Sequence, residues 1–148
     1  MRVIIQRVSR ASVSVQEEVI GAIQKGFMIL VGVEDDDNDQ DVLYLARKIS
    51  NMRIFDDEEG KMNRSLKDVG GSVLSISQFT LHAQTKKGNR PSFIDAAAPE
   101  YANKLYEQLN ECIRAEGITV EEGKFGANMQ VALVNDGPVT IWLDSKNK

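Results

Sequence analysis

The stretch Ser72–Leu81, which reads SVLSISQFTL, decides how this chain is organised. It begins with β-branched and aliphatic residues after two glycines, which is typical of the start of a strand. It then becomes polar at Ser77-Gln78 and carries a further hydroxyl at Thr80, and functional sites often begin where a strand ends. Side chains alternate along a straight strand, so Ser77 and Thr80 would face opposite sides. Either only one of these two side chains is functional, or the backbone bends near Phe79 and brings both to one site. The non-functional interpretation is an ordinary polar strand end that the threonine caps.

The composition is that of one ordinary domain. The 148 residues are 42% hydrophobic, which is enough for a real core. The formal charge of −4 does not attract polyanions, so any contact with nucleic acid requires a local basic patch. Cys112 is the only cysteine and His82 the only histidine, so we expect no disulfide, no metal and no cofactor. No apolar run approaches the length of about 18 residues that a membrane span needs, and the expected location is the cytoplasm.

The order of expected elements predicts a single α+β domain over residues 1–148. The expected strands are Arg2–Val8, Ala11–Val15, Val19–Ile23, Phe27–Val33, Met52–Phe55, Ile118–Glu121, Asn128–Asn135 and Val139–Leu143. The first four follow one another closely and predict an antiparallel meander. Apolar residues at helical spacing predict helices over Asp41–Ser50 and Pro99–Ala115. Lys61–Val69 is expected to be irregular, and Lys146–Lys148 to be a frayed tail.

Three other stretches have both an ordinary and a functional interpretation. The acidic cluster Glu34–Asp39 lacks the glycine of a calcium loop, so we expect it to cap the helix that follows. The only concentrated basic loop, Ala83–Phe93, carries Lys86, Lys87 and Arg90; it is either a solvated loop or a phosphate contact. The composition of Asn135–Pro138 predicts a surface turn. Cys112 lies in the apolar stripe of the second helix and is expected in the core.

Two motifs in register resemble those of the D-aminoacyl-tRNA deacylase (D-tyrosyl-tRNA deacylase) family. They are Ser77–Thr80 (SQFT) and Asn135–Thr140 (NDGPVT). The likeness runs from Met1 to about Leu143 without gaps. The supporting stretches are Arg7–Val13, Lys61–Asn63, Asp68–Gly71, Arg90–Phe93 and Phe125–Val131.

The resemblance implies an α+β fold with a curved, mainly antiparallel, barrel-like sheet and two main helices. It implies hydrolysis of the ester that joins a D-amino acid, or mischarged glycine, to the 3′ end of tRNA, with no DNA or membrane partner. It also implies a homodimer, in which Gly137-Pro138 of one chain, joined by a cis bond, enters the pocket of the other. The carbonyl groups there would exclude L-amino acids.

By the same resemblance, the catalytic positions are Ser77, Gln78, Phe79 and Thr80. Backbone N–H groups near Phe79 would face the ester carbonyl, while the 2′-hydroxyl of the RNA helps to activate water. The terminal adenosine would lie among Phe125, Gly126, Ala127 and Met129. Lys86, Lys87 and Arg90 are expected near phosphates on the basis of their charge and position alone.

Two other functions remain open at this level. One is a non-enzymatic dimeric module that binds nucleotides. The other is a general esterase with Ser77 or Thr80 as nucleophile, although a hydroxyl without a neighbouring base is a poor nucleophile. His82 follows Thr80 by two residues and is the one histidine that could act as that base.

Overall fold

The long strand β1 (Arg2–Val15) organises the sheet in the computed structural model, which describes all residues, Met1–Lys148. It pairs antiparallel with β2 (Glu18–Ile23), with β3 (Gly26–Gly32) and, along its whole length, with β8 (Gln130–Asp144). Beyond β3 the sheet continues through β6 (Ser72–Ser77) and β7 (Val120–Glu122), and both of these pairings are parallel. The expected sheet is therefore confirmed as mainly antiparallel, but it is a mixed sheet.

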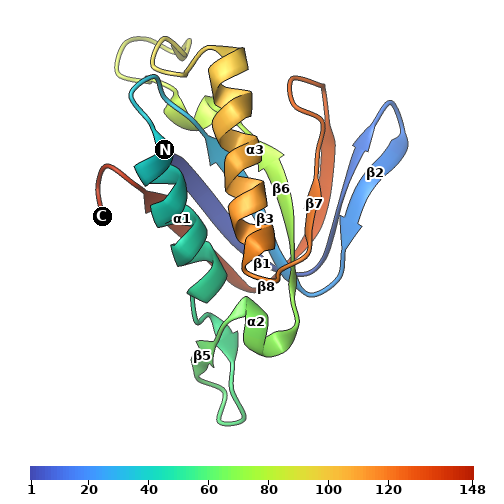
Figure 1. Ribbon diagram of the computed structural model, residues 1–148. Helices are drawn as coiled ribbons and strands as arrows, with labels where there is room; N and C mark the ends of the chain where they lie inside the picture. The colour runs from blue at the N-terminus through green and yellow to red at the C-terminus, as the bar shows by residue number, and fades with distance from the viewer.

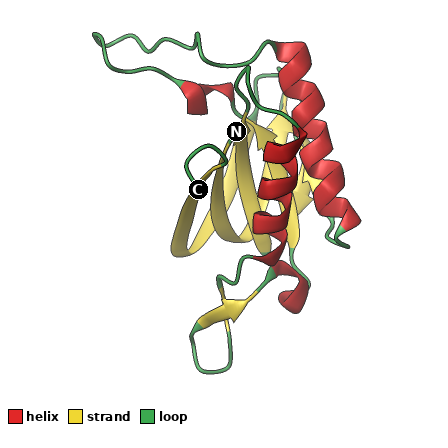
Figure 2. Ribbon diagram, turned by 60° about the vertical axis from the view of Figure 1, so that its left-hand side comes forward, coloured by secondary structure: helices red, strands yellow, loops and turns green.

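Two long helices cover one face of this sheet, as Figure 2 shows. They are α1 (Asp39–Asn51) and α3 (Pro99–Ala115), which lie side by side in Figure 1. A cluster of 23 buried residues fills the space between the helices and the sheet, so this layer is the main core. Seven further buried residues, including Val8, Leu74 and Ile76, form a second cluster. Partly buried residues of β8 pack against that second cluster, which gives the sheet its curved, barrel-like form.

The helix starts follow the expected capping chemistry. Asn38 caps α1, and the side chain of Asp41 bonds back to the Asn38 N–H at 2.8 Å. The acidic cluster therefore serves the helix start, as predicted. Pro99 occupies the first turn of α3, where a missing N–H costs nothing. Cys112 is half-buried against the main core, and burial together with Asp39 and Glu111 raises the pKa of its thiol.

Several expected boundaries were wrong. The first two expected strands are one continuous strand, β1, and β2 does not pair with β3, so there is no simple meander. The expected strand at Met52–Phe55 is only β4 (Phe55–Asp56). The segment expected to be irregular contains β5 (Met62–Arg64) and the short helix α2 (Leu66–Val69), because Ser65 caps that helix. No helix is long and apolar enough to cross a membrane.

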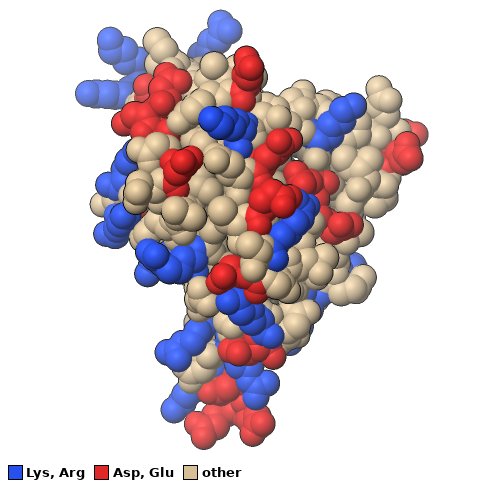
Figure 3. All heavy atoms as spheres, viewed as in Figure 1, with Lys and Arg blue, Asp and Glu red and all other residues tan.

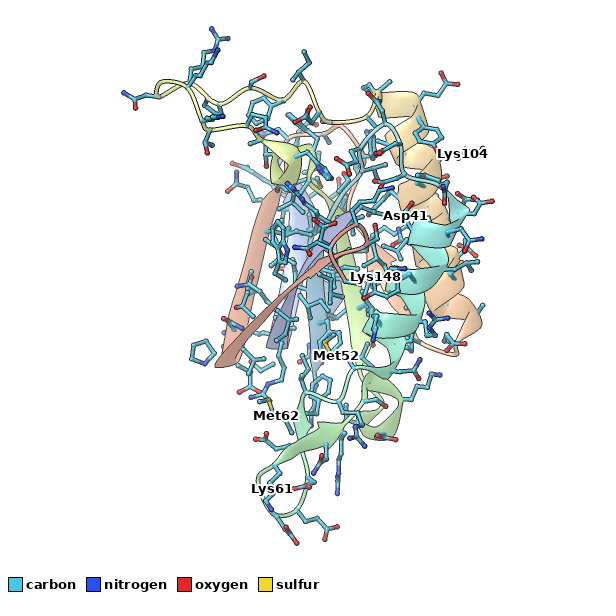
Figure 4. The ribbon with its side chains drawn as sticks, turned by 90° about the vertical axis from the view of Figure 1, so that its left-hand side faces the viewer. Asp41, Met52, Lys61, Met62, Lys104 and Lys148 are labelled. Atoms are coloured by element: carbon cyan, nitrogen blue, oxygen red, sulfur yellow. The ribbon has the colours of Figure 1, made fainter.

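The β4–β5 hairpin and the C-terminal residues complete the molecule. Figure 4 places Lys61 and Met62 on this hairpin, at the end of the molecule away from the long loop between β6 and α3. The chain end is not the expected frayed tail. The Lys146 ammonium lies 3.4 Å from the carboxylates of both Asp37 and Asp41, and the Ser145 hydroxyl donates to Asp41 at 2.6 Å.

Candidate active site

The backbone bends in the polar stretch after β6, so Ser77 and Thr80 are not held on opposite faces as they would be in a straight strand. Gln78 leaves the strand with φ −148° and ψ 84°, and a 3-10 helix, η1, follows over Phe79–His82. The Gln78 N–H still donates to the Val31 carbonyl at 2.7 Å, so the bend is fixed to the end of β3. The side-chain amide of Gln78 donates to the Thr80 hydroxyl. Ser77, Gln78 and Thr80 therefore form one polar corner, which a straight strand could not do.

The packing of η1 on the sheet depends on a missing side chain at Gly32. A Cβ there would lie 2.9 Å from Leu81 Cβ and 3.1 Å from the Gln78 carbonyl oxygen. The Arg2 guanidinium donates to the Leu81 carbonyl at 2.8 Å and holds the other side of the turn. The first turn of a helix leaves its N–H groups without partners inside the helix. The N–H groups of Phe79 and Thr80 are therefore available to a ligand at a fixed position.

A cavity of about 660 Å³ lies beside this corner. Fourteen of its nineteen lining residues are hydrophobic, so it suits an apolar or aromatic group held by a few polar contacts. Ser77, Gln78 and Phe79 line the cavity. Thr80 does not line it, but its hydroxyl accepts a hydrogen bond from the side-chain amide of Gln78, which does. The other lining residues are Val31, Val33, Ile76, Phe93, Ala96, Ala97, Ala98, Pro99, Ala102, Tyr106, Phe125, Gly126, Ala127, Asn128, Met129 and Val131.

The residues expected around the nucleoside also line the cavity. Phe125, Gly126, Ala127 and Met129 all contribute to its wall. Gly126 has φ +78°, a left-handed conformation that favours glycine, and it lies within the turn between β7 and β8. The structure therefore brings together the two groups of residues that the sequence placed in one site.

Tyr106 of α3 was not predicted, and it ties the two halves of the cavity together. Its hydroxyl donates to the Ser75 carbonyl at 2.6 Å, and its ring lies 6.1 Å from that of Phe125. Burial raises the pKa of Tyr106, so the hydroxyl remains a neutral donor. A tyrosine within the apolar stripe of a helix needs a partner for its hydroxyl, and that requirement was the available signal.

The basic residues lie outside the cavity. Lys86, Lys87 and Arg90 are exposed on the loop between η1 and α3, and none of them lines the cavity wall. Figure 3 shows Lys and Arg side chains projecting at its upper left, where Figure 1 draws this loop. Phe93, which the prediction did not assign to the site, is the part of this loop that reaches the cavity.

His82 does not form a catalytic pair with either hydroxyl. Its side chain is buried, and no hydrogen bond joins it to Ser77 or Thr80. Its nearest charged neighbour is Glu34, whose carboxylate lies 3.6 Å from Nδ1. The geometry therefore offers no base for a serine or threonine nucleophile.

Gly137 and Pro138 do not form the expected surface turn. Both lie within β8, which pairs with β1 on either side of them: Asn135 faces Val8, and Thr140 faces Gln6. The intervening residues form a wide bulge opposite Arg7, and the Gly137-Pro138 bond is cis, as the resemblance implied. Composition predicted a turn because a bulge of this size uses the same residue types.

Arg7 holds the bulge in place. Its guanidinium donates to the Asp136 carbonyl at 3.1 Å and to the Ile54 carbonyl at 2.7 Å. The carboxylates of Asp56 and Asp136 lie at 3.6 and 3.5 Å from it. The Arg7 side chain is buried, whereas the two carboxylates are more than half exposed, and the hydrogen bonds that the charged guanidinium donates are stronger than those between neutral groups. The bulge therefore has a fixed position on the surface of the sheet.

The bulge and the polar corner are far apart within one chain. Along the sheet, Arg7 is level with Phe27 and Val73, whereas Ser77 is level with Val31. Those four residues along a strand span about 13 Å. Neither Gly137 nor Pro138 lines the cavity.

Comparisons with known proteins show the family to which the chain belongs. A model of the D-Tyr-tRNA(Tyr) deacylase family matches residues 4–144. A D-aminoacyl-tRNA deacylase of Bacillus pumilus (strain SAFR-032) is 60% identical over 146 residues, which is 99% of each chain. A solved structure described as c-Myc DNA Unwinding Element Binding Protein is 42% identical with a TM-score of 0.91, over 97% of this chain and 98% of that one.

A second solved structure, described as a probable eukaryotic D-amino acid tRNA deacylase, shares the fold. It has a TM-score of 0.82 and 18% identity, over 96% of this chain and 97% of that one. By class, the protein is a hydrolase built on a single α+β domain. It belongs to the D-Tyr-tRNA(Tyr) deacylase family.

Proposed function

We propose that the protein hydrolyses the ester of D-aminoacyl-tRNA in the cavity beside Gln78 and Phe79, and releases the free D-amino acid and tRNA. The observation that carries this proposal is the bend after β6, which leaves the main-chain N–H groups at the start of η1 without hydrogen-bond partners, next to an apolar cavity that Phe79 lines. The cavity is large and apolar enough for the terminal adenosine, and Phe125 and Met129 are among its lining residues. The expected location is the cytoplasm, where charged tRNA is used.

The reaction requires little from the side chains. Water attacks the ester carbonyl, and the N–H groups of Phe79 and Thr80 stabilise the charge that develops on the oxygen. The bond between the carbonyl carbon and the ribose oxygen then breaks, and that oxygen takes up a proton. The 2′-hydroxyl of the terminal ribose helps to activate the water, while Ser77 and Gln78 shape the pocket. The absence of a base beside Ser77 or Thr80 supports this mechanism over a covalent one.

Selection against L-amino acids is assigned to Gly137 and Pro138 of a second chain. Both residues are exposed, and Arg7 fixes the position of the bulge that carries them. Main-chain carbonyls cannot swing aside as side chains do, so they exclude one mirror form without binding the other. Glycine has no side chain to exclude, so glycine mischarged on tRNA is also expected to be a substrate.

A homodimer would bring the two parts of the site together. The bulge lies too far along the sheet to reach the corner of its own chain. The edge of β8 is unpaired, and it exposes the large apolar side chains of Val134 and Trp142 on either side of the bulge. Exposed apolar side chains beside an open strand edge are typical of a protein interface.

The direct test offers D-Tyr-tRNA and L-Tyr-tRNA to the purified protein in parallel. Selective loss of the D ester is the expected result. Equal loss of both esters would instead indicate a general esterase, and no loss would indicate a binding module.

Lys86, Lys87 and Arg90 are proposed to contact phosphates near the 3′ end. Changing all three to glutamine should weaken tRNA binding and flatten its dependence on salt, because fewer counterions are released. The measurement is the dissociation constant at several salt concentrations. An unchanged affinity and slope would remove these residues from the site.

A further inference from the structure

Two aromatic side chains at the rim of the cavity have no role in the proposed reaction. Phe79 is 56% exposed and Phe93 is 38% exposed, although both line the cavity. Their ring centroids are 5.1 Å apart with an interplanar angle of 79°, so the rings meet edge to face. This arrangement leaves a ring face uncovered. Exposed aromatic surface beside a cavity commonly marks a binding surface.

The loop that carries Phe93 is held as a hairpin, so the position of this side chain is defined. Gln84 and Ser92 exchange two backbone hydrogen bonds of 2.7 and 2.9 Å, and the Gln84 amide donates to Asp95. The exposed tip of the same hairpin carries Lys86, Lys87 and Arg90. Phe93 follows Arg90 by three residues, which span at most about 10 Å. Positive charge therefore lies close to the aromatic rim.

We propose that Phe79 and Phe93 form a stacking platform for the base of the nucleotide that precedes the aminoacylated terminal nucleoside. This proposal rests on the proposed function: the terminal nucleoside and the ester fill the cavity, so the strand leaves across its rim. Aromatic faces beside positive charge bind single strands, because bases stack on the rings while the charges meet the backbone. The occupant is thus a single-stranded 3′ end.

The platform acts on binding and not on the chemical step. Every base has a face that can stack, so the contact tolerates any base at this position. The rings carry no polar group that could contact the reacting atoms, and they hold a nucleotide that does not change during the reaction, so they stabilise ground state and transition state alike. Loss of the platform should therefore raise KM and leave kcat unchanged.

The experiment measures the dissociation constants of two labelled oligonucleotides that end in CCA. One is intact, and the other lacks the base at the penultimate position. The variant Phe93→Leu removes the ring, and Phe93→Tyr keeps it. Ile94→Ser is the matched control, because Ile94 is 80% exposed on the same loop but does not line the cavity.

For the wild type, loss of the penultimate base should weaken binding at least about fivefold, which is the lower range for one stacked base. Phe93→Leu should bind the intact oligonucleotide as weakly as the abasic one, with no further loss when both changes are combined. Phe93→Tyr and Ile94→Ser should resemble the wild type. On D-Tyr-tRNA, Phe93→Leu should raise KM at constant kcat.

Equal binding of the two oligonucleotides by the wild type would overturn the platform. Equal weakening of the binding of both oligonucleotides in Phe93→Leu would also overturn it. A changed oligomeric state in Phe93→Leu would do the same, because it would mean that a second copy of the chain covers the rim. These binding results do not depend on hydrolysis. If the wild type shows the base dependence but cleaves no D ester, the platform stands and the proposed reaction is wrong.

Discussion

At the scale of single residues, the main-chain N–H of Phe79 is the group on which the proposed chemistry depends. Phe79 opens a 3-10 helix, and the residue before it has an extended φ of −148°. Proline is tolerated at the first position of a helix, and it disfavours the α region for the residue before it, a region that Gln78 with ψ 84° does not occupy. A substitution by proline therefore removes this one N–H with little change of backbone.

Phe79→Pro should lower kcat for D-tyrosyl-adenosine by about 100- to 1,000-fold, as the loss of one oxyanion donor does elsewhere. Phe79→Leu is the matched variant, because it loses the ring and keeps the N–H. It should retain kcat on this short substrate, because the main-chain donor is unchanged. Equal kcat values for the two variants would argue against a main-chain donor.

Gly32 is a positioning residue, since it acts through the corner that packs against it. Gly32→Ala would push against Leu81 and the Gln78 carbonyl, and a displacement of the donors should lower kcat about 10- to 100-fold with little change in KM. Gly71→Ala is the control: its Cβ would meet the end of the buried Leu66 side chain at 2.9 Å and the Lys25 carbonyl oxygen at 3.3 Å, and neither residue lines the cavity. A parallel loss of kcat in both variants would indicate a general packing defect.

The polar corner was predictable because its residues are contiguous in the sequence, whereas the rest of the wall was not. Ser77 and Gln78 are polar residues that follow an apolar run, and this change predicts the end of the strand. Tyr106 and Phe93 come from a helix and a loop that only the fold brings to the cavity. The strand pattern also allowed a bend near Phe79 without requiring it, because the hydrogen bond from Gln78 to Val31 that fixes the bend is a contact between distant parts of the chain.

At the scale of elements, β8 shows why local composition misassigned a functional segment. Asn135–Pro138 has turn composition, yet the chain continues in the same direction along β1. The difference comes from β1, which supplies partners on both sides of the bulge, and from the Arg7 contacts. None of these partners is near in sequence. The helices were better predicted, because apolar spacing and caps are local features.

The Arg7 contacts make a prediction about this element. Arg7→Lys keeps the charge but cannot reproduce the planar fork that reaches both Asp136 and Ile54. It should cost about 1–3 kcal/mol of unfolding free energy and lower the preference for the D ester over the L ester. Denaturant melts and paired D and L assays measure the two effects. Gln6→Lys is the neighbouring control on β1, and an unchanged ratio of D to L rates in Arg7→Lys would contradict the role of the bulge.

At the scale of the whole molecule, a charge cluster joins α1 to the chain end. Burial alone would raise the pKa of Asp41, but hydrogen bonds from Ser145 and Asn38 and the charge of Lys146 lower it below the ordinary value of 3.8. A carboxyl whose pKa is lowered by folding stabilises the protein above its unfolded pKa. The contribution of Asp41 to stability is therefore lost as the pH falls below the unfolded pKa and through the lower pKa of the folded state.

Asp41→Asn should therefore lower stability at neutral pH and make stability less dependent on pH in the acid range. Denaturant unfolding at several pH values from neutral to about pH 3 measures this, with the unfolded pKa as the reference. Asp35→Asn, at an exposed position of the same acidic cluster, should retain the wild-type pH dependence. An Asp41→Asn curve parallel to that of the wild type would remove this linkage.

We propose that each active site is formed by two chains, because the Gly137-Pro138 bulge cannot reach the polar corner of its own chain. Two variants separate the parts. Gly137→Ala damages the bulge, since the added Cβ would lie 2.9 Å from both the Arg7 guanidinium and the Val139 side chain at a φ of +121°. Phe79→Pro damages the corner and leaves the bulge intact.

The most direct measurement adds a large excess of Phe79→Pro chains to Gly137→Ala chains, allows the subunits to exchange, and follows D-Tyr-tRNA and L-Tyr-tRNA. Alone, Gly137→Ala should discriminate poorly, and Phe79→Pro should cleave neither ester. In the mixture, nearly every intact corner faces an intact bulge from its partner, so the ratio of D to L rates should rise toward that of the wild type. A ratio that stays at the value of Gly137→Ala alone would contradict a site shared between two chains.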